Sequence, residues 1–110
     1  MTAAESKFSK QKTLEKLSKD ESENVRMCVA ENENSSAELL NSMIDILYSN
    51  SDLYSSKVKL AIAKNNNCSQ KTIEKIYDKE YDNGEMLAAL CENQNTPTKI
   101  LNEIALMLFN

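Results

Sequence analysis

The sequence predicts an all-α protein made of tandem helical repeats. Three similar stretches begin at Val25, Val58 and Met86, so the repeat spacing is 33 and then 28 residues. Self-similarity at such a spacing is typical of stacked units, each too small to bury its apolar face alone. One Gly and one Pro in 110 residues also argue against a β fold rich in tight turns. We expect a short right-handed α-solenoid of stacked helical hairpins, with about three repeats and about six to seven helices, although composition alone does not fix its handedness.

The chain is expected to form one domain. Residues 1–10 contain few apolar side chains and are predicted to be a flexible N-terminus, after which Thr13 opens a short helix in a half repeat at 11–20. A single helical-repeat domain then covers residues 11–110. Within it the full repeats are expected at about 22–48, 52–79 and 84–109.

Polar residues mark the expected helix ends. Ser22 is a good cap for the first helix of the first full repeat. Asn32 should end that helix, since Asn tolerates the left-handed conformation at a helix C-terminus. Ser35, with Glu38 three residues later, forms a capping-box pattern for the next helix. That helix has a continuous apolar stripe, made of Leu39, Leu40, Met43, Ile44 and Leu47.

The last helix departs from this pattern. Its inward stripe is predicted to be Ile100, Leu101, Ile104 and Leu108. Leu106, Met107 and Phe109 fall outside that stripe, which leaves an apolar end where a repeat protein normally presents a polar one. One hypothesis is a contact surface, including a homodimer through this C-terminal helix. The alternative is that Met107 and Phe109 fold back over the final repeat.

The aligned residues carry a string that is apolar–Arg/Lys–x–x–apolar–Ala–x–Asn–x–Asn, then a small or polar pair and spaced Leu or Ile. It occupies Val25–Met43, Val58–Ile76 and Met86–Ile104. This string resembles the variant leucine-rich repeat family, a relative of HEAT-like helical repeats. The resemblance implies a superhelix of alternating helices, some of them short 3₁₀ turns. The longer spacing here makes full HEAT-like hairpins the other expectation. Some family members bind an iron–sulfur cluster through a cysteine-rich segment that has no counterpart here, so no cofactor is expected.

The three cysteines fall at equivalent repeat positions. Cys28 aligns with Ala61 and Ala89, and Cys91 aligns with alanines of the other repeats, so both are predicted to be small buried core residues. Cys68 instead aligns with the presumed capping residues of the other repeats. A thiol at a helix N-terminus can have a lowered pKa, which makes Cys68 a candidate reactive residue. The alternative is an inert thiol.

The composition argues against catalysis. The chain has no His and a single Gly, so neither a Ser–His or Cys–His pair nor a Gly-rich phosphate loop can form. The acidic clusters do not follow the spacing of a calcium loop. We therefore predict no enzyme activity, no metal site and no cofactor. No apolar stretch approaches the length of a membrane span, and the cysteines form no disulfide pattern, so we expect a cytoplasmic protein without membrane contact.

The leading functional prediction is a protein-interaction scaffold built from helical repeats. Candidate partner-binding residues are polar, aromatic and C-terminal apolar side chains outside the repeat cores, namely Arg26, Tyr54, Lys57, Lys59, Tyr77, Tyr81, Leu106, Met107 and Phe109. One alternative is a nucleic-acid-binding module, because residues 57–79 carry six lysines against two acidic residues. A net charge of -4 weakly opposes that alternative. Another is a homo-oligomeric accessory or regulatory subunit.

The asparagine pairs allow two interpretations. The pairs are Asn32/Asn34, Asn65/Asn67 and Asn93/Asn95. They could line up as an amide ladder that binds a ligand, or they could satisfy backbone groups where each helix stops. We favour the second interpretation, which predicts that Asn65→Ala costs about 1 kcal/mol of stability, the scale of a lost cap.

Overall fold

The computed structural model describes residues 3–50 and 55–108. This part of the chain contains seven α-helices and no strand, so the predicted all-α class is confirmed. The helices are α1 (Ala3–Leu17), α2 (Glu23–Glu31), α3 (Ala37–Ser49), α4 (Ser56–Lys64), α5 (Gln70–Glu80), α6 (Gly84–Glu92) and α7 (Thr98–Leu108).

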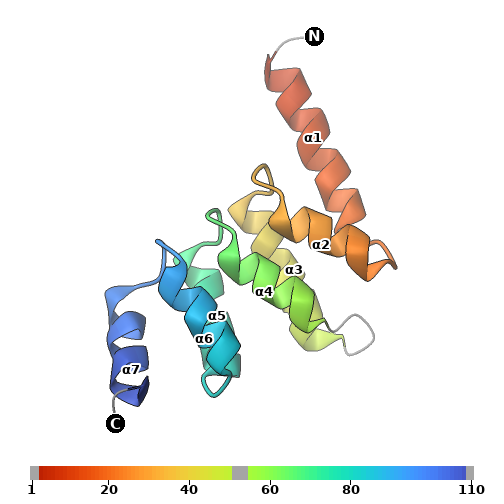
Figure 1. Ribbon diagram of the computed structural model, residues 1–110. Helices are drawn as coiled ribbons and strands as arrows, with labels where there is room; N and C mark the ends of the chain where they lie inside the picture. Colours follow the sequence, from red (N-terminus) through yellow and green to blue (C-terminus); the bar gives the residue numbers. More distant parts are fainter. Residues whose placement is uncertain (1–2, 51–54, 109–110) are drawn as a thin grey trace.

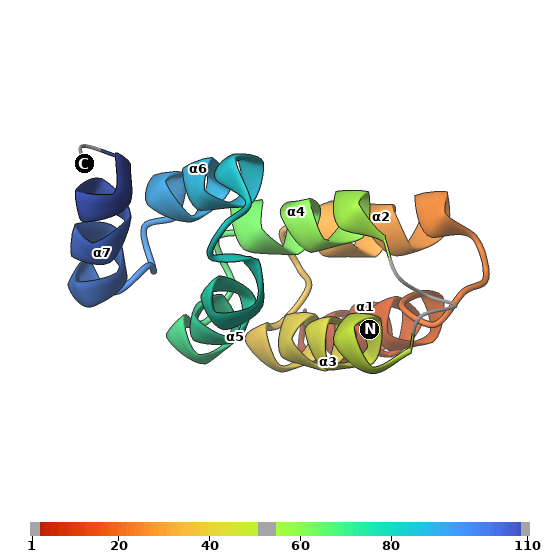
Figure 2. The same cartoon turned by 90° about the horizontal axis from the view of Figure 1, so that it is seen from below.

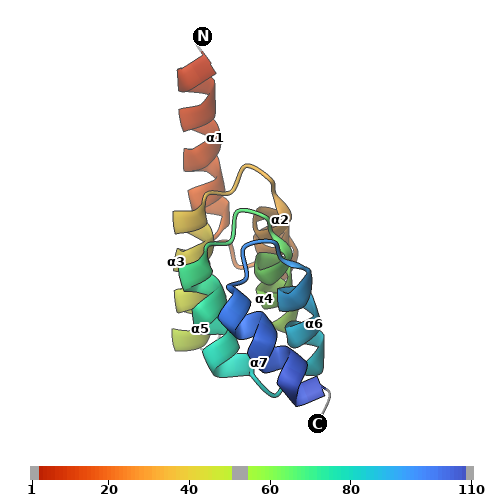
Figure 3. The same cartoon turned by 90° about the vertical axis from the view of Figure 1, so that its left-hand side faces the viewer.

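The helices form two layers. The helices that contain the three similar sequence stretches, α2, α4 and α6, lie side by side in one layer (Figure 1). The second layer contains α1, α3 and α5 (Figure 2). The last helix, α7, packs on α6 at the C-terminal end, and Figure 3 shows the view onto this end. The described chain is elongated, with extents of 55 × 32 × 18 Å.

Aliphatic side chains fill the space between the layers. Val29, Ile62 and Leu90 occupy equivalent positions in α2, α4 and α6, and they are 1%, 0% and 0% exposed. The predicted stripe of α3 is buried at every position, and it includes Leu40 and Ile44. Because all three repeats bury the same positions, the core is continuous along the layers.

Serine or asparagine side chains cap the N-termini of α2, α3, α4, α5 and α6, but not all at the predicted residues. Ser22 caps α2, as predicted. The capping box at Ser35 is wrong, because Ser36 caps α3 by accepting from the backbone N–H of Leu39. Ser35 is fully buried, and its hydroxyl donates to the carbonyl of Val29 at 2.6 Å.

Asparagine ends the first helix of each repeat without the expected left-handed backbone. Asn32, Asn65 and Asn93 are the C-caps, and their φ angles are -71°, -74° and -80°. No residue in the described ranges has a positive φ. The reason for asparagine here is therefore its side-chain hydrogen bonds and not its tolerance of the left-handed region.

The two ends of the chain also differ from the prediction. The helix that was expected to open near Thr13 begins at Ala3, so residues 3–10 belong to α1. In α7, Ile100 and Ile104 are buried as predicted, but Leu108 is 66% exposed and does not join the inward stripe.

Candidate functional site

The asparagine side chains are used to join neighbouring repeats. The amide of Asn65 donates to the carbonyls of Ala30 at 2.9 Å and Asn32 at 3.0 Å in the preceding loop. The amide of Asn93 repeats this one unit later, at 2.7 Å to Ala63 and 3.2 Å to Asn65. This ladder satisfies backbone carbonyls that the helix ends leave open, which accords with its structural interpretation.

The second asparagine of each pair extends the ladder. Asn67 donates to the carbonyls of Glu33 and Ser35 at 2.7 and 2.9 Å. Asn95 donates in the same way to the loop that contains Cys68. The amides of these four asparagines are therefore engaged by backbone and do not present a free edge to a ligand.

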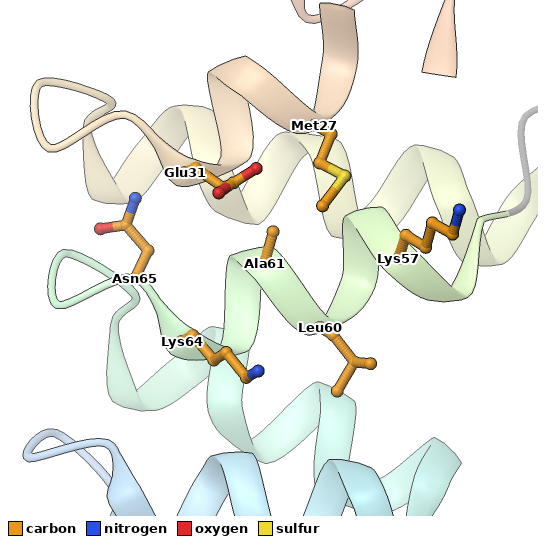
Figure 4. A pocket seen from close by; sticks show the side chains of 7 residues that line it. All are labelled: Met27, Glu31, Lys57, Leu60, Ala61, Lys64 and Asn65. Atoms are coloured by element: carbon orange, nitrogen blue, oxygen red, sulfur yellow. The ribbon is translucent and has the colours of Figure 1, made fainter. Parts of the chain in front are cut away.

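A groove of about 370 Å³ lies between α2 and α4. Its floor contains Met27 of α2 with Leu60 and Ala61 of α4, and Figure 4 shows Met27 reaching from α2 toward Ala61. Met27 and Leu60 are half-buried, so each offers apolar surface to an incoming group. This groove is the first candidate site.

The rim of the α2–α4 groove is mainly basic. Lys57 and Lys64 lie toward the two ends of α4, with Glu31 of α2 as the only acidic lining residue in the described chain (Figure 4). Seven residues separate the two lysines, which corresponds to about 10 Å along a helix axis. Both side chains are exposed and neither forms an ion pair within the described residues. The groove can therefore receive an apolar group flanked by two negative charges.

A second groove, of about 500 Å³, lies between α5 and α7. Its aromatic surface comes from Tyr77 and Tyr81, one helical turn apart on α5. Glu103 of α7 lines the same groove as Tyr77. Desolvation, followed by hydrogen bonding to Glu103 and the charge of Glu103, raises the pKa of Tyr77 above its usual value of 10.0. The remaining lining residues are Glu74, Asp78, Pro97, Lys99 and Ile100.

Several predicted partner-binding residues line these grooves or lie exposed. Lys57 lines the first groove, and Tyr77 and Tyr81 line the second. Leu106 and Met107 are 64% and 43% exposed on α7, as expected from their places outside the apolar stripe. The structure does not bring these five residues into one surface.

Two predicted contact residues are buried, and that part of the prediction is wrong. Arg26 and Lys59 occupy equivalent positions on α2 and α4, and they are 7% and 2% exposed. Both lie on the side of their helix that faces the second layer. Lys59 pairs with Glu80 at the end of α5, and Arg26 lines a small cavity together with Leu47 of α3. The remaining candidates, Tyr54 and Phe109, lie outside the described residues.

Lys59 belongs to a buried polar cluster that joins α3, α4 and α5. Its ammonium forms an ion pair with Oε2 of Glu80, and it lies 5.2 Å from the ring centroid of Tyr48. The hydroxyl of Tyr48 donates to the same carboxylate oxygen at 3.0 Å. Burial alone would raise the pKa of Glu80, but the hydrogen bonds from Lys59, Tyr48 and Asn83 and the charge of Lys59 lower it below 4.5.

The cysteine predictions are reversed. Cys28 and Cys91 were expected in the core, but both are exposed. Their equivalents, such as Ala61 and Ala63, face neighbouring repeats, whereas Cys28 lies on the first helix of its layer and Cys91 on the last. Cys68 is fully buried, and desolvation raises its pKa to about 12, which contradicts a reactive thiol.

The lysines of residues 57–79 do not form one basic surface. Lys59 is buried, and Lys75 bonds Asp45 at 2.9 Å. The others divide between α4 and α5, which lie in different layers (Figure 2). Sequence reasoning missed this because it counted charge along the chain without the layer assignment.

Sequence reasoning also missed most of the groove lining. Met27, Leu60 and Lys64 are on the outward side of α2 and α4, and Glu103 is on α7. An apolar residue at the outward position of both sequence stretches, Met27 and Leu60, was the available signal.

None of the family models, curated proteins or solved structures compared with this chain matches it. Within the described residues, no helix combines the length and apolar character needed to cross a bilayer.

Proposed function

We propose that this protein is a non-catalytic interaction scaffold, built as a short α-solenoid of the HEAT-like or variant leucine-rich repeat type. Support for the solenoid comes from the shared core positions of the three repeats and from the ladder through Asn65 and Asn93. Repeat architectures of this kind present extended surfaces to partners.

The observation that carries the binding role is the α2–α4 groove, with an apolar floor between Lys57 and Lys64. Its complement is an acidic peptide segment with an apolar side chain between carboxylates. Attraction between these groups orients the segment, and burial of the apolar side chain supplies affinity.

A direct test uses a fluorescein-labelled peptide with one leucine flanked by glutamates, titrated with the full chain. We expect the double variant Lys57→Glu/Lys64→Glu to weaken binding by at least about tenfold. Lys71→Glu/Lys79→Glu makes the same charge change on α5 and should have a much smaller effect. Equal weakening by both pairs would sink the groove assignment.

Two other roles remain proposals with less support. A nucleic-acid role would require the lysines to act together, and their division between layers favours a protein partner instead. A homodimer through α7 is supported by the exposure of Leu106, Met107 and Leu108. Sedimentation velocity at micromolar concentration tests the homodimer, since a strict monomer would exclude it.

A further inference from the structure

The groove between α5 and α7 contains a tyrosine equivalent to the one in the buried cluster around Lys59, but no residue equivalent to Lys59 itself. Tyr48 and Tyr81 are equivalent residues, 33 positions apart near the ends of α3 and α5. Tyr48 covers the Lys59 ammonium at 5.2 Å. The fold therefore already contains one cation held by this tyrosine position.

The sequence places no cation at the position equivalent to Lys59 in the segment that follows Tyr81. The residue equivalent to Lys59 is Leu87, and the residue equivalent to Glu80 is Leu108. Tyr81 is 58% exposed, compared with the half-buried Tyr48. The aromatic face that Tyr48 uses for an internal lysine is thus accessible at Tyr81.

Carboxylates line the same groove as this accessible ring. Glu74 and Asp78 of α5 and Glu103 of α7 line the groove, against a single lining cation in the described chain, Lys99. Glu74 and Asp78 are exposed and form no hydrogen bond or ion pair within the described residues. The groove has the charge that favours a basic ligand, and it also has an apolar wall at Ile100.

The packing of α7 leaves room for that ligand. Whereas α5 packs on α3 in the second layer, α7 packs on α6. The resulting volume of about 500 Å³ lies within the range of sites that hold small groups.

We propose that the α5–α7 groove binds a basic segment of a partner protein, with a lysine or arginine side chain placed over Tyr81 and paired with Asp78 or Glu74. The bound cation takes the role that Lys59 plays against Tyr48, and attraction to the ring adds to the ion pairs. This site is separate from the α2–α4 groove and prefers the opposite charge, so either proposal can fail without the other.

The test titrates the full chain against a fluorescein-labelled peptide of alternating arginine and leucine. A matched peptide carries citrulline, which keeps the shape of arginine without its charge. We expect the citrulline peptide to bind at least about tenfold more weakly. Comparable affinity of the two peptides would overturn the proposal.

Three variants locate the binding. Glu74→Gln/Asp78→Asn should weaken arginine-peptide binding about tenfold, and Tyr81→Leu about threefold. Glu33→Gln/Glu92→Gln removes two exposed carboxylates elsewhere, and its affinity should stay at the wild-type value. If this control weakens binding as much as the groove pair does, the attraction is due to net charge and the site is wrong. Thermal melts confirm that each variant is folded.

Discussion

The side-chain nitrogen of Asn93 lies 3.2 Å from the backbone carbonyl oxygen of Asn65, its equivalent one repeat earlier. Asn65 makes the same bond to Asn32 at 3.0 Å. Each loop is thus fixed to the loop before it by an asparagine side chain. The same side chain also stabilises its own turn, because its Oδ1 accepts a hydrogen bond from the backbone N–H two residues later. The ladder positions the helices that form both grooves.

Asn65→Ala should destabilise the protein by more than the lost cap that the sequence suggested. Asn65 is 8% exposed and its side chain makes three hydrogen bonds, so truncation to Ala leaves two carbonyls and one N–H without this partner. We expect a loss of about 2–3 kcal/mol in the free energy of unfolding, measured by urea denaturation. Asn66→Ala is the control, because its side chain is exposed, and a change below about 0.5 kcal/mol is expected there. Equal effects at the two positions would contradict the ladder.

Cys68→Ser should stabilise the protein. The equivalent hydroxyls of Ser35 and Thr96 each donate to a helix carbonyl at 2.6 Å. The Cys68 thiol lacks that bond in the described structure and lies 3.9 Å from the carbonyl of Ser69. Restoring the hydroxyl should raise the free energy of unfolding by about 0.5–1 kcal/mol, as measured by urea denaturation. A lower free energy of unfolding in the variant would contradict this prediction, because the packing of the buried sulfur would then contribute more than the new hydrogen bond.

Two of the three thiols should react readily in the native protein. Cys28 and Cys91 are exposed, whereas Cys68 is buried with a pKa of about 12. At pH 8 its thiolate fraction is on the order of 10⁻⁴, and the folded chain also blocks access. Titration with Ellman's reagent should show two fast thiols and a third only on unfolding. In Cys28→Ser/Cys91→Ser, fast reaction of the native protein would disprove the burial of Cys68.

Glu80→Gln should make the free energy of unfolding depend less on pH in the acid range. The folded-state pKa of Glu80 is lowered, so its ionised form stabilises the fold above the ordinary glutamate pKa of 4.5, and this contribution is lost as pH falls through the lowered value. The wild-type midpoint in urea should therefore fall between neutral and acid pH more steeply than that of the variant. Parallel pH profiles would contradict the assignment.

Lys59→Ala should be strongly destabilising at neutral pH. It leaves the Glu80 carboxylate without its ammonium partner and creates a cavity where a side chain is 2% exposed. We expect a loss of about 3 kcal/mol from thermal and urea unfolding. Lys57→Ala removes an exposed lysine from the same helix and should cost less than about 0.5 kcal/mol. Similar losses in both variants would mean that Lys59 is not held in the cluster.

Local pattern sufficed for the helices and their core. The period of apolar residues placed Val29, Ile62 and Leu90 inside, because an amphipathic helix must bury one face whatever its neighbours are. The sequence pattern also predicted that α2, α4 and α6 each end at an asparagine. It erred by one residue at Ser35, because two adjacent serines can both cap and only the backbone course selects between them.

The sequence by itself determined the all-α class and the equivalent apolar positions that α2, α4 and α6 bury, since these depend on residue spacing within a single helix. Tertiary structure decided what lies between repeats: the bonding of Asn93 to Asn65, the burial of Lys59 and the exposure of Cys28 and Cys91. A residue on the flank of a helix is covered only if another helix packs there. The neighbours that bond or cover these residues are about thirty residues away in the chain, so spacing within one helix does not identify them.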